Sequence, residues 1–130
     1  MTILQYPHPM LRTVCSESGE ITSDDIRSMF ALMQANHGAG LSAPQVGINA
    51  RVFVTDWGQV FVNPVIAAKS EVMVIFMEGC LSLPGVQAFT LRHKWIELDT
   101  GEVFRGKRAI VIQHEMDHLD GRLIIDNPGE

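Results

Sequence analysis

The hydrophobic positions before residue 38 repeat at the spacing of one helix face. Four apolar residues fall on that face: Ile26, Met29, Phe30 and Met33. Thr22 or Ser23 can cap the N-terminus of such a helix, because a hydroxyl there accepts from free backbone N–H groups. Gly38 stands where the helix should end. We therefore predict one amphipathic helix over this segment.

Shorter apolar segments follow, and they are rich in β-branched and aromatic residues. Turn signals such as Trp57-Gly58 and Thr100-Gly101 separate them. We predict five short, mostly antiparallel strands: Arg51 to Asp56, Val60 to Ile66, Glu71 to Met77, Gln87 to Leu91 and Lys94 to Asp99. The segment from Gly38 to Gln45 lies between the helix and these strands, and we expect it to be a loop.

A second helix is predicted near the end of the chain. Ala109-Ile110-Val111-Ile112 is continuously apolar, and Gly121 stands where a C-terminal cap is expected. A helix that is apolar nearly all round is buried. The sequence therefore predicts a single α+β domain over residues 1–130, in which short strands surround this helix.

The buried helix carries the motif H-E-x-x-H at His114, Glu115 and His118. Two histidines four residues apart share a helix face, so both imidazoles can reach one metal ion. Glu115 would lie beside that ion, where a carboxylate can deprotonate a metal-bound water. The motif therefore predicts a hydrolytic metal site. Such strings also occur by chance, and the alternative is a helix face with two solvated histidines.

A hydrolytic site needs a third protein ligand, and no histidine follows the motif. Of the two cysteines upstream, Cys80 is the better candidate, because Gly79 beside it would let the backbone approach another group closely. A thiolate with two imidazoles suits Zn(II) or Fe(II). Cys15 has no motif around it, and we expect a small core residue or an exposed thiol there.

Two other classes of protein could carry this helix. A minimal zinc peptidase would need a downstream ligand, for which only the acids Asp120, Asp126 and Glu130 are present. A binding module without catalysis would have lost its ligands, whereas Cys80, both histidines and Glu115 are present.

Three separated segments resemble the signature motifs of the peptide deformylases, in the family's order: Gly38-Ala39-Gly40-Leu41-Ser42-Ala43-Pro44-Gln45, Glu78-Gly79-Cys80-Leu81-Ser82 and Gln113-His114-Glu115-Met116-Asp117-His118. The opening residues Ile3 to Arg12 are similar to the family's N-terminal stretch, and the resemblance runs to about Ile125. Ser42 departs from the alanine most common in the first motif. The chain resembles a short form without the family's C-terminal helix, similar to deformylases of phage origin.

This resemblance implies removal of the formyl group from N-formylmethionine at the start of new polypeptides. It also implies one divalent metal ion, natively Fe(II), with Zn(II), Ni(II) and Co(II) as alternatives. The metal ligands would be Cys80, His114 and His118. Glu115 would take the proton of the metal-bound water and pass it to the leaving amine.

The oxyanion donors and a substrate slot can be assigned from residues expected near the metal. The side-chain amide of Gln45 and the backbone N–H of Leu81 would stabilise the oxyanion. Apolar residues near the metal would form a slot for the methionine side chain: Ala39, Gly40, Leu81, Ile110 and Val111. Plain core packing is the alternative for Ile110 and Val111. Gly40 would let the substrate backbone approach, unless it is a simple turn glycine.

Three charged residues are expected to support the metal ligands. Glu78 and Asp117 lie within the motifs, and Asp117 should point away from the metal by helical phase. Asp117 would anchor the helix to a cation such as Arg92, or orient a ligand histidine. The alternative for Asp117 is an ordinary surface aspartate.

The formal net charge of −5 disfavours nucleic acid as a direct partner, because phosphate binding needs a clustered basic surface. The densest basic cluster, Arg105 with Lys107-Arg108, is expected to be a solvated helix start.

The N-terminus carries no targeting signal, and no apolar run approaches the ~20 residues that span a bilayer. With two cysteines far apart, these features predict no membrane contact and a location in the cytoplasm of a bacterium or phage-infected host.

The expected partners are N-formylmethionyl peptides and nascent chains, and we expect a monomer. Longer members of the family are thought to dock at the ribosome through a basic C-terminal helix. The negative charge of this chain offers no substitute for that helix, so ribosome docking is not expected.

Overall fold

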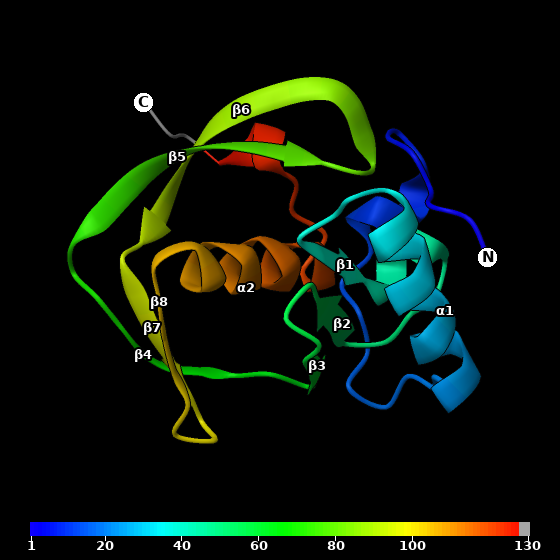
Figure 1. Ribbon diagram of the computed structural model, residues 1–130, viewed down its shortest axis with the longest axis horizontal. Helices are drawn as coiled ribbons and strands as arrows, with labels where there is room; N and C mark the ends of the chain where they lie inside the picture. The colour runs from blue at the N-terminus through cyan, green and yellow to red at the C-terminus, as the bar shows by residue number, and fades with distance from the viewer. Residues whose placement is uncertain (128–130) are drawn as a thin grey trace.

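Three small antiparallel sheets surround one central helix in the computed structural model, which describes residues 1–127 (Figure 1). The central helix is α2 (Gly106–Leu119), and strands of all three sheets contact it. Helix α1 (Ser23–Ala35) lies at the outside and packs on the first sheet. The predicted α+β fold, with short strands around a helix that carries H-E-x-x-H, is confirmed.

The described strands pair in antiparallel fashion within each sheet. The first sheet has the order β1-β2-β3, formed by Gly40–Ser42, Val52–Thr55 and Val60–Val62. The second has the order β4-β7-β8, formed by Ile66–Lys69, Trp95–Leu98 and Val103–Arg105. The third is a hairpin of two longer strands, β5 (Met73–Cys80) and β6 (Leu83–His93). Short 3₁₀ helices are η1 (Pro9–Arg12), η2 (Ala43–Val46) and η3 (Ile124–Asp126).

One apolar run that predicts a single strand forms two strands instead. The run from Val60 to Ile66 is interrupted because Asn63 adopts a φ of 47° and Pro64 has no N–H for a ladder. β3 therefore ends at Val62, and Ile66 begins β4 in another sheet.

The β5–β6 hairpin is longer at its closed end than the sequence predicts. The predicted strands end at Met77 and begin at Gln87, whereas antiparallel pairing continues to Cys80 and Leu83. Gly79, Pro84 and Gly85 are turn signals, yet the pairing continues across a shift in register between Gly79 and Cys80. Cys80 is therefore the last residue of a paired strand.

The segment from Gly38 to Gln45 is not the simple loop that we expect from the sequence. It contains β1 and most of η2, and α1 has already ended at Ala35. His37 leaves the helical conformation with a φ of 55°. β1 and β8 are three residues long, which is too short for a hydrophobic period to predict them.

Burial of α2 follows from its apolar sequence. Ala109, Ile112 and Leu119 are fully buried in a core shared with Phe53, Phe61, Ile96, Leu98 and Phe104. Gly121 follows the helix with a φ of 72°, where a glycine cap is predicted, and a Cβ there would lie 2.5 Å from the carbonyl oxygen of Arg12. Cys15 is buried, and its N–H donates to the carbonyl of Leu119 at 2.8 Å, so this cysteine is a small core residue.

No helix within residues 1–127 has the length and apolar character needed to cross a membrane.

Candidate metal centre and active-site cleft

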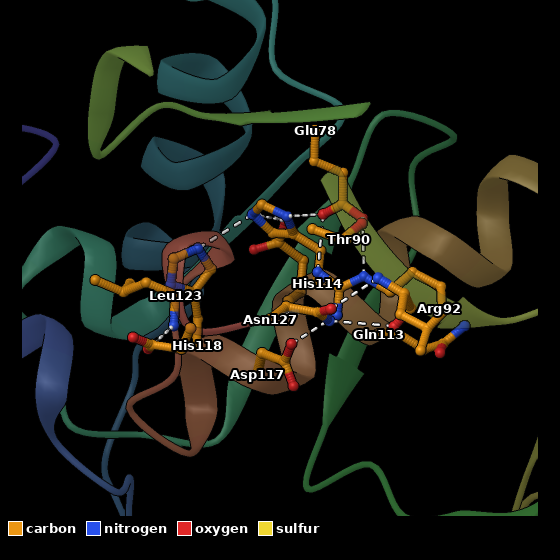
Figure 2. Close-up of polar contacts among 12 residues, drawn as sticks. Glu78, Thr90, Arg92, Gln113, His114, Asp117, His118, Leu123 and Asn127 are labelled. Carbon is orange, nitrogen blue, oxygen red and sulfur yellow. Dashed lines mark hydrogen bonds and ion pairs between the residues drawn. The ribbon is translucent and has the colours of Figure 1, made fainter. Parts of the chain in front are cut away.

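Three potential metal ligands converge between the β5–β6 hairpin and helix α2. Sγ of Cys80 lies 3.4 Å from Nε2 of His118, which lies 3.2 Å from Nε2 of His114. The three ligand atoms all lie within 4.8 Å of one another. Figure 2 shows the imidazole of His118 directed toward that of His114. The i, i+4 spacing on α2 brings the two rings together, and the end of β5 brings the sulfur.

The environment of His114 determines which of its nitrogens faces the other ligands. Nδ1 lies 2.7 Å from Oε1 of Glu78, a carboxylate that only accepts when ionised. Burial would raise the pKa of Glu78, but hydrogen bonds from Arg92 and His114 outweigh burial and lower this pKa to about 2. Nδ1 of His114 therefore carries a proton, and Nε2 is the nitrogen that faces Cys80 and His118.

The charges of this cluster favour one bound cation. Burial alone would lower the pKa of His114, but the charge of Glu115 and hydrogen bonds with Cys80 and Glu78 outweigh burial and raise it to about 10. Burial lowers the pKa of His118, and the charge of His114 lowers it further. The cluster thus attracts one positive charge while His118 stays neutral. The sulfur and the two imidazole nitrogens of this cluster are suitable donors for a divalent transition metal.

Glu115 lies beside the three ligands. Its side chain is buried, with Oε2 3.9 Å from Nε2 of His114, and Oε1 has no hydrogen-bond partner within residues 1–127. Burial raises the pKa of Glu115 to about 7, and the charge of His114 opposes that shift. A carboxyl group that titrates near neutral pH can both accept and return a proton. The free oxygen leaves one acceptor for a water or a substrate.

Two glycines near the site differ in what a side chain at their positions would meet. A Cβ at Gly40 would lie 2.7 Å from Oε2 of Glu115 and 3.0 Å from its Cγ and Cδ, so Gly40 makes room for this carboxylate. A Cβ at Gly79 would meet only the carbonyl oxygen of Val86, at 3.9 Å, so the argument that Gly79 allows a close approach is wrong. Strand pairing positions Cys80 instead.

Gln45 is buried in η2, and its orientation is determined by Ser42. Oε1 of Gln45 accepts from the N–H of Ser42 at 3.0 Å and from its hydroxyl at 2.9 Å. The amide Nε2 must then face the other way, where it donates to Oγ of Ser82 at 3.1 Å and lies 3.7 Å from Sγ of Cys80. The amide donor of Gln45 is therefore held next to the ligand cluster.

A cleft of about 560 Å³ opens over the ligand cluster. Its walls include Gln45, Cys80, His114 and Glu115, together with all five residues predicted for a substrate slot: Ala39, Gly40, Leu81, Ile110 and Val111. Ile110 and Val111 are mostly buried, at 7 % and 8 % exposed, and they contribute to the cleft wall. Phe76, Met77 and Val86 of the hairpin add further apolar surface.

Arg92 links the hairpin to the far side of α2. Its Nε and Nη2 donate to Glu78, each at 2.8 Å, and its Nη1 donates to Asp117 at 2.6 Å (Figure 2). Asp117 does not line the cleft, as its helical phase indicates, and Arg92 connects it to the carboxylate that holds His114.

Three hydroxyl groups take part in this arrangement without having been predicted. Ser42 orients Gln45, Ser82 accepts from Gln45, and Thr90 donates to the carboxylate of Glu78. Ser42 and Ser82 lie inside the motif segments, and this position could have identified them from the sequence. Thr90 lies two residues before Arg92 on the same strand face, and no motif points to it.

Comparison with known proteins agrees with the three motifs. The family model for polypeptide deformylase matches residues 1–129. The peptide deformylase of Stenotrophomonas maltophilia (strain R551-3) is 39% identical over 150 residues, covering 97% of this chain and 85% of that protein. The crystal structure of peptide deformylase from Thermotoga maritima superimposes with a TM-score of 0.87 at 34% identity, covering 98% of this chain and 97% of that one. The deformylase from the Vibrio parahaemolyticus bacteriophage VP16T, solved with actinonin, gives a TM-score of 0.88 at 32% identity, covering 95% and 100%. The motif resemblance is thereby confirmed, and the chain belongs to the polypeptide deformylase family.

Proposed function

We propose that this protein is a metal-dependent hydrolase that removes the formyl group from N-formylmethionine at the start of polypeptides. The observation that carries the proposal is the convergence of Cys80, His114 and His118 beside the buried carboxylate of Glu115. These residues lie under a cleft with apolar walls. The relatives named peptide deformylase support the same chemistry. N-formylmethionyl peptides and nascent chains are the substrates that follow.

Cys80, His114 and His118 would hold one divalent cation, which we infer to be Fe(II) natively, with Zn(II), Ni(II) or Co(II) as substitutes. When bound, such a cation lowers the pKa of water toward ~7 and polarises a carbonyl group. Glu78 prepares the site by holding Nδ1 of His114, so that Nε2 is the nitrogen turned toward the cation position.

Glu115 is the general base and then the general acid. Attack of water on the formyl carbon requires a proton acceptor, and the free, buried Oε1 of Glu115 supplies one. As the C–N bond breaks, Glu115 returns this proton to the methionine nitrogen. Formate and a free N-terminus leave the cleft.

Gln45 and Leu81 supply the donors that stabilise the oxyanion. Because Ser42 holds Oε1 of Gln45, the Nε2 group is fixed next to Cys80 before substrate arrives. The backbone N–H of Leu81, in the turn directly after Cys80, is the second donor. A fixed donor of this kind contributes roughly 10²–10³ in turnover.

The apolar wall next to these groups selects methionine. Ile110 and Val111 lie one helical turn before His114, and with Ala39, Gly40 and Leu81 they shape a slot for an unbranched side chain. We also infer a monomer that acts in the cytosol. The two free thiols, Cys15 and Cys80, are typical of a reducing compartment.

Formate release tests the proposal directly. Protein purified without oxygen should contain one metal ion per chain and release formate from formyl-Met-Ala-Ser, while acetyl-Met-Ala-Ser stays intact. Cys80→Ala should lose both metal and activity, whereas the matched variant Cys15→Ala, buried in the core, should keep both. No formate from metal-loaded protein, or full metal content in Cys80→Ala, would overturn the proposal.

A further inference from the structure

We propose that Lys107 selects formylated substrates that carry a carboxylate shortly after the methionine. The inference rests on the proposed function and adds a specificity-determining residue to it. Lys107 lies in the first turn of α2 and lines the cleft. Within residues 1–127 it is the single lysine or arginine that does so.

The basic residues at the start of α2 face different ways. The guanidinium of Arg105 lies 6.0 Å from the ring centroid of Trp95, and that of Arg108 lies 4.9 Å from the ring of Trp57. Both arginines cover aromatic rings outside the cleft, where cation–π contact holds them. Of these three basic residues, Lys107 is the one that lines the cleft.

The ammonium group of Lys107 is free to meet an incoming anion. Lys107 is exposed, and none of the ion pairs within residues 1–127 includes it. The acids of the cleft wall have other partners, since Glu78 pairs with Arg92 and Glu115 faces His114. A carboxylate that enters with the substrate would therefore meet an unneutralised cation.

Lys107 lies where the substrate residues that follow the N-formylmethionine would pass. Lys107 and His114 are seven positions apart, which is two turns and about 10 Å along one face of α2. Ile110 and Val111, the proposed methionine slot, lie between them. An extended peptide rises about 3.3 Å per residue, so its second or third residue comes within reach of the flexible lysine side chain.

The carboxylate could belong to a side chain or to the C-terminus of a very short peptide. Amidated pairs separate these sources: formyl-Met-Glu-Ala-amide against its Gln analogue, formyl-Met-Ala-Glu-amide against its Gln analogue, and formyl-Met-Ala as acid against amide. We expect kcat/KM to favour the carboxylate by about three- to fivefold in at least one pair at low salt, and the preference should shrink in high salt.

Substitution of Lys107 provides the decisive comparison. Lys107→Gln should bring the preferred ratio close to one, and Lys107→Glu should invert it. Arg108→Gln, which removes the same charge from a neighbouring site outside the cleft, should leave the ratio unchanged. A wild-type ratio of one in all three pairs, or an unaltered ratio in Lys107→Glu, would overturn this inference while formate release from the neutral peptides still supported the proposed function. Loss of formate release from every peptide would instead overturn both.

Discussion

Nδ1 of His114 and Oε1 of Glu78 are joined by a hydrogen bond of 2.7 Å, and this bond determines which nitrogen of His114 faces Cys80. Glu78 is held in turn by two bonds from Arg92, whose third nitrogen pairs with Asp117. The orientation of this candidate ligand on α2 therefore depends on an ion-pair network that starts on the hairpin and returns to the same helix.

Glu78→Gln should weaken metal binding by about 10- to 100-fold, because an amide no longer fixes the proton of His114 on Nδ1. It also leaves the buried guanidinium of Arg92 short of a partner charge, which should lower the free energy of unfolding by about 3–5 kcal/mol. Chelator competition measures the first effect and urea denaturation the second. Glu71→Gln changes an exposed carboxylate before the same hairpin, and it should alter neither quantity. Wild-type metal affinity in Glu78→Gln would show that this bond does not orient His114.

Glu115→Gln should retain stoichiometric metal, because Glu115 lies outside the ligand set. Turnover should fall by at least about 10²-fold, the scale of a lost general base. Metal analysis and kcat on a formylated peptide, measured on the same preparation, separate the two effects. A kcat within a few-fold of wild type would remove Glu115 from the proton transfer.

Gly40→Ala should impair catalysis by displacing Glu115, since the added methyl group would lie 2.7 Å from Oε2. We expect kcat to fall by about tenfold or more while the metal stays bound. Gly79→Ala should have a much smaller effect, because its Cβ would meet only the oxygen of Val86 at 3.9 Å. Equal losses in the two variants would contradict the steric role assigned to Gly40.

Gln45→Ala should lower kcat more than it raises KM, because the amide acts on the oxyanion of the transition state. The expected loss is roughly 10²–10³. Ser42→Ala removes one of the two bonds that orient the amide and keeps the backbone N–H bond, so it should cost less than about tenfold. If Ser42→Ala were as damaging as Gln45→Ala, the hydroxyl would itself act on the substrate.

Cys15 should resist alkylation in the folded protein. Burial raises the pKa of its thiol, against the opposing charge of Arg51. Iodoacetamide should modify Cys80 once the metal is chelated, and Cys15 only in denaturant, as mapped by peptide mass spectrometry.

The raised pKa of Cys15 belongs to the folded state, so the thiol of the unfolded chain ionises first, above about pH 8.5. The free energy of unfolding should therefore fall as pH rises there. Cys15→Ala should reduce this slope.

The sequence indicated the ligand cluster better than it indicated the roles of neighbouring residues. Helical period alone places His114 and His118 on one face, and the resemblance of three motifs points to Cys80 as the partner. Steric roles are different, because they depend on segments that meet only in the folded chain. Gly40 and Glu115 lie in separate motifs, and nothing in either motif shows that a Cβ at one would strike the other.

The fold was predictable where a periodic pattern was long. The first helix follows from hydrophobic period, the second from its apolar run and glycine cap, and the main strands from β-branched and aromatic residues between turn signals. The three-residue strands β1 and β8 are too short for such patterns. The break after Val62 falls at Asn63-Pro64, a dipeptide that is typical of turns and that the prediction of one continuous strand did not take into account. The basic cluster at the start of α2 is a similar case. Arg105 and Arg108 contact Trp95 and Trp57, which lie elsewhere in the sequence, and Lys107 lines the cleft.

The β5–β6 hairpin forms a sheet of its own and is attached to α2 by side chains, including the amide of Gln113 on the backbone of His93. A cation shared by Cys80 and the two histidines would fasten this hairpin to the helix in the way that a disulfide closes a loop. The same hairpin supplies Phe76, Met77 and Val86 to the cleft wall. Oxidation of Cys80 would therefore loosen the surface that recognises the substrate as well as end the chemistry.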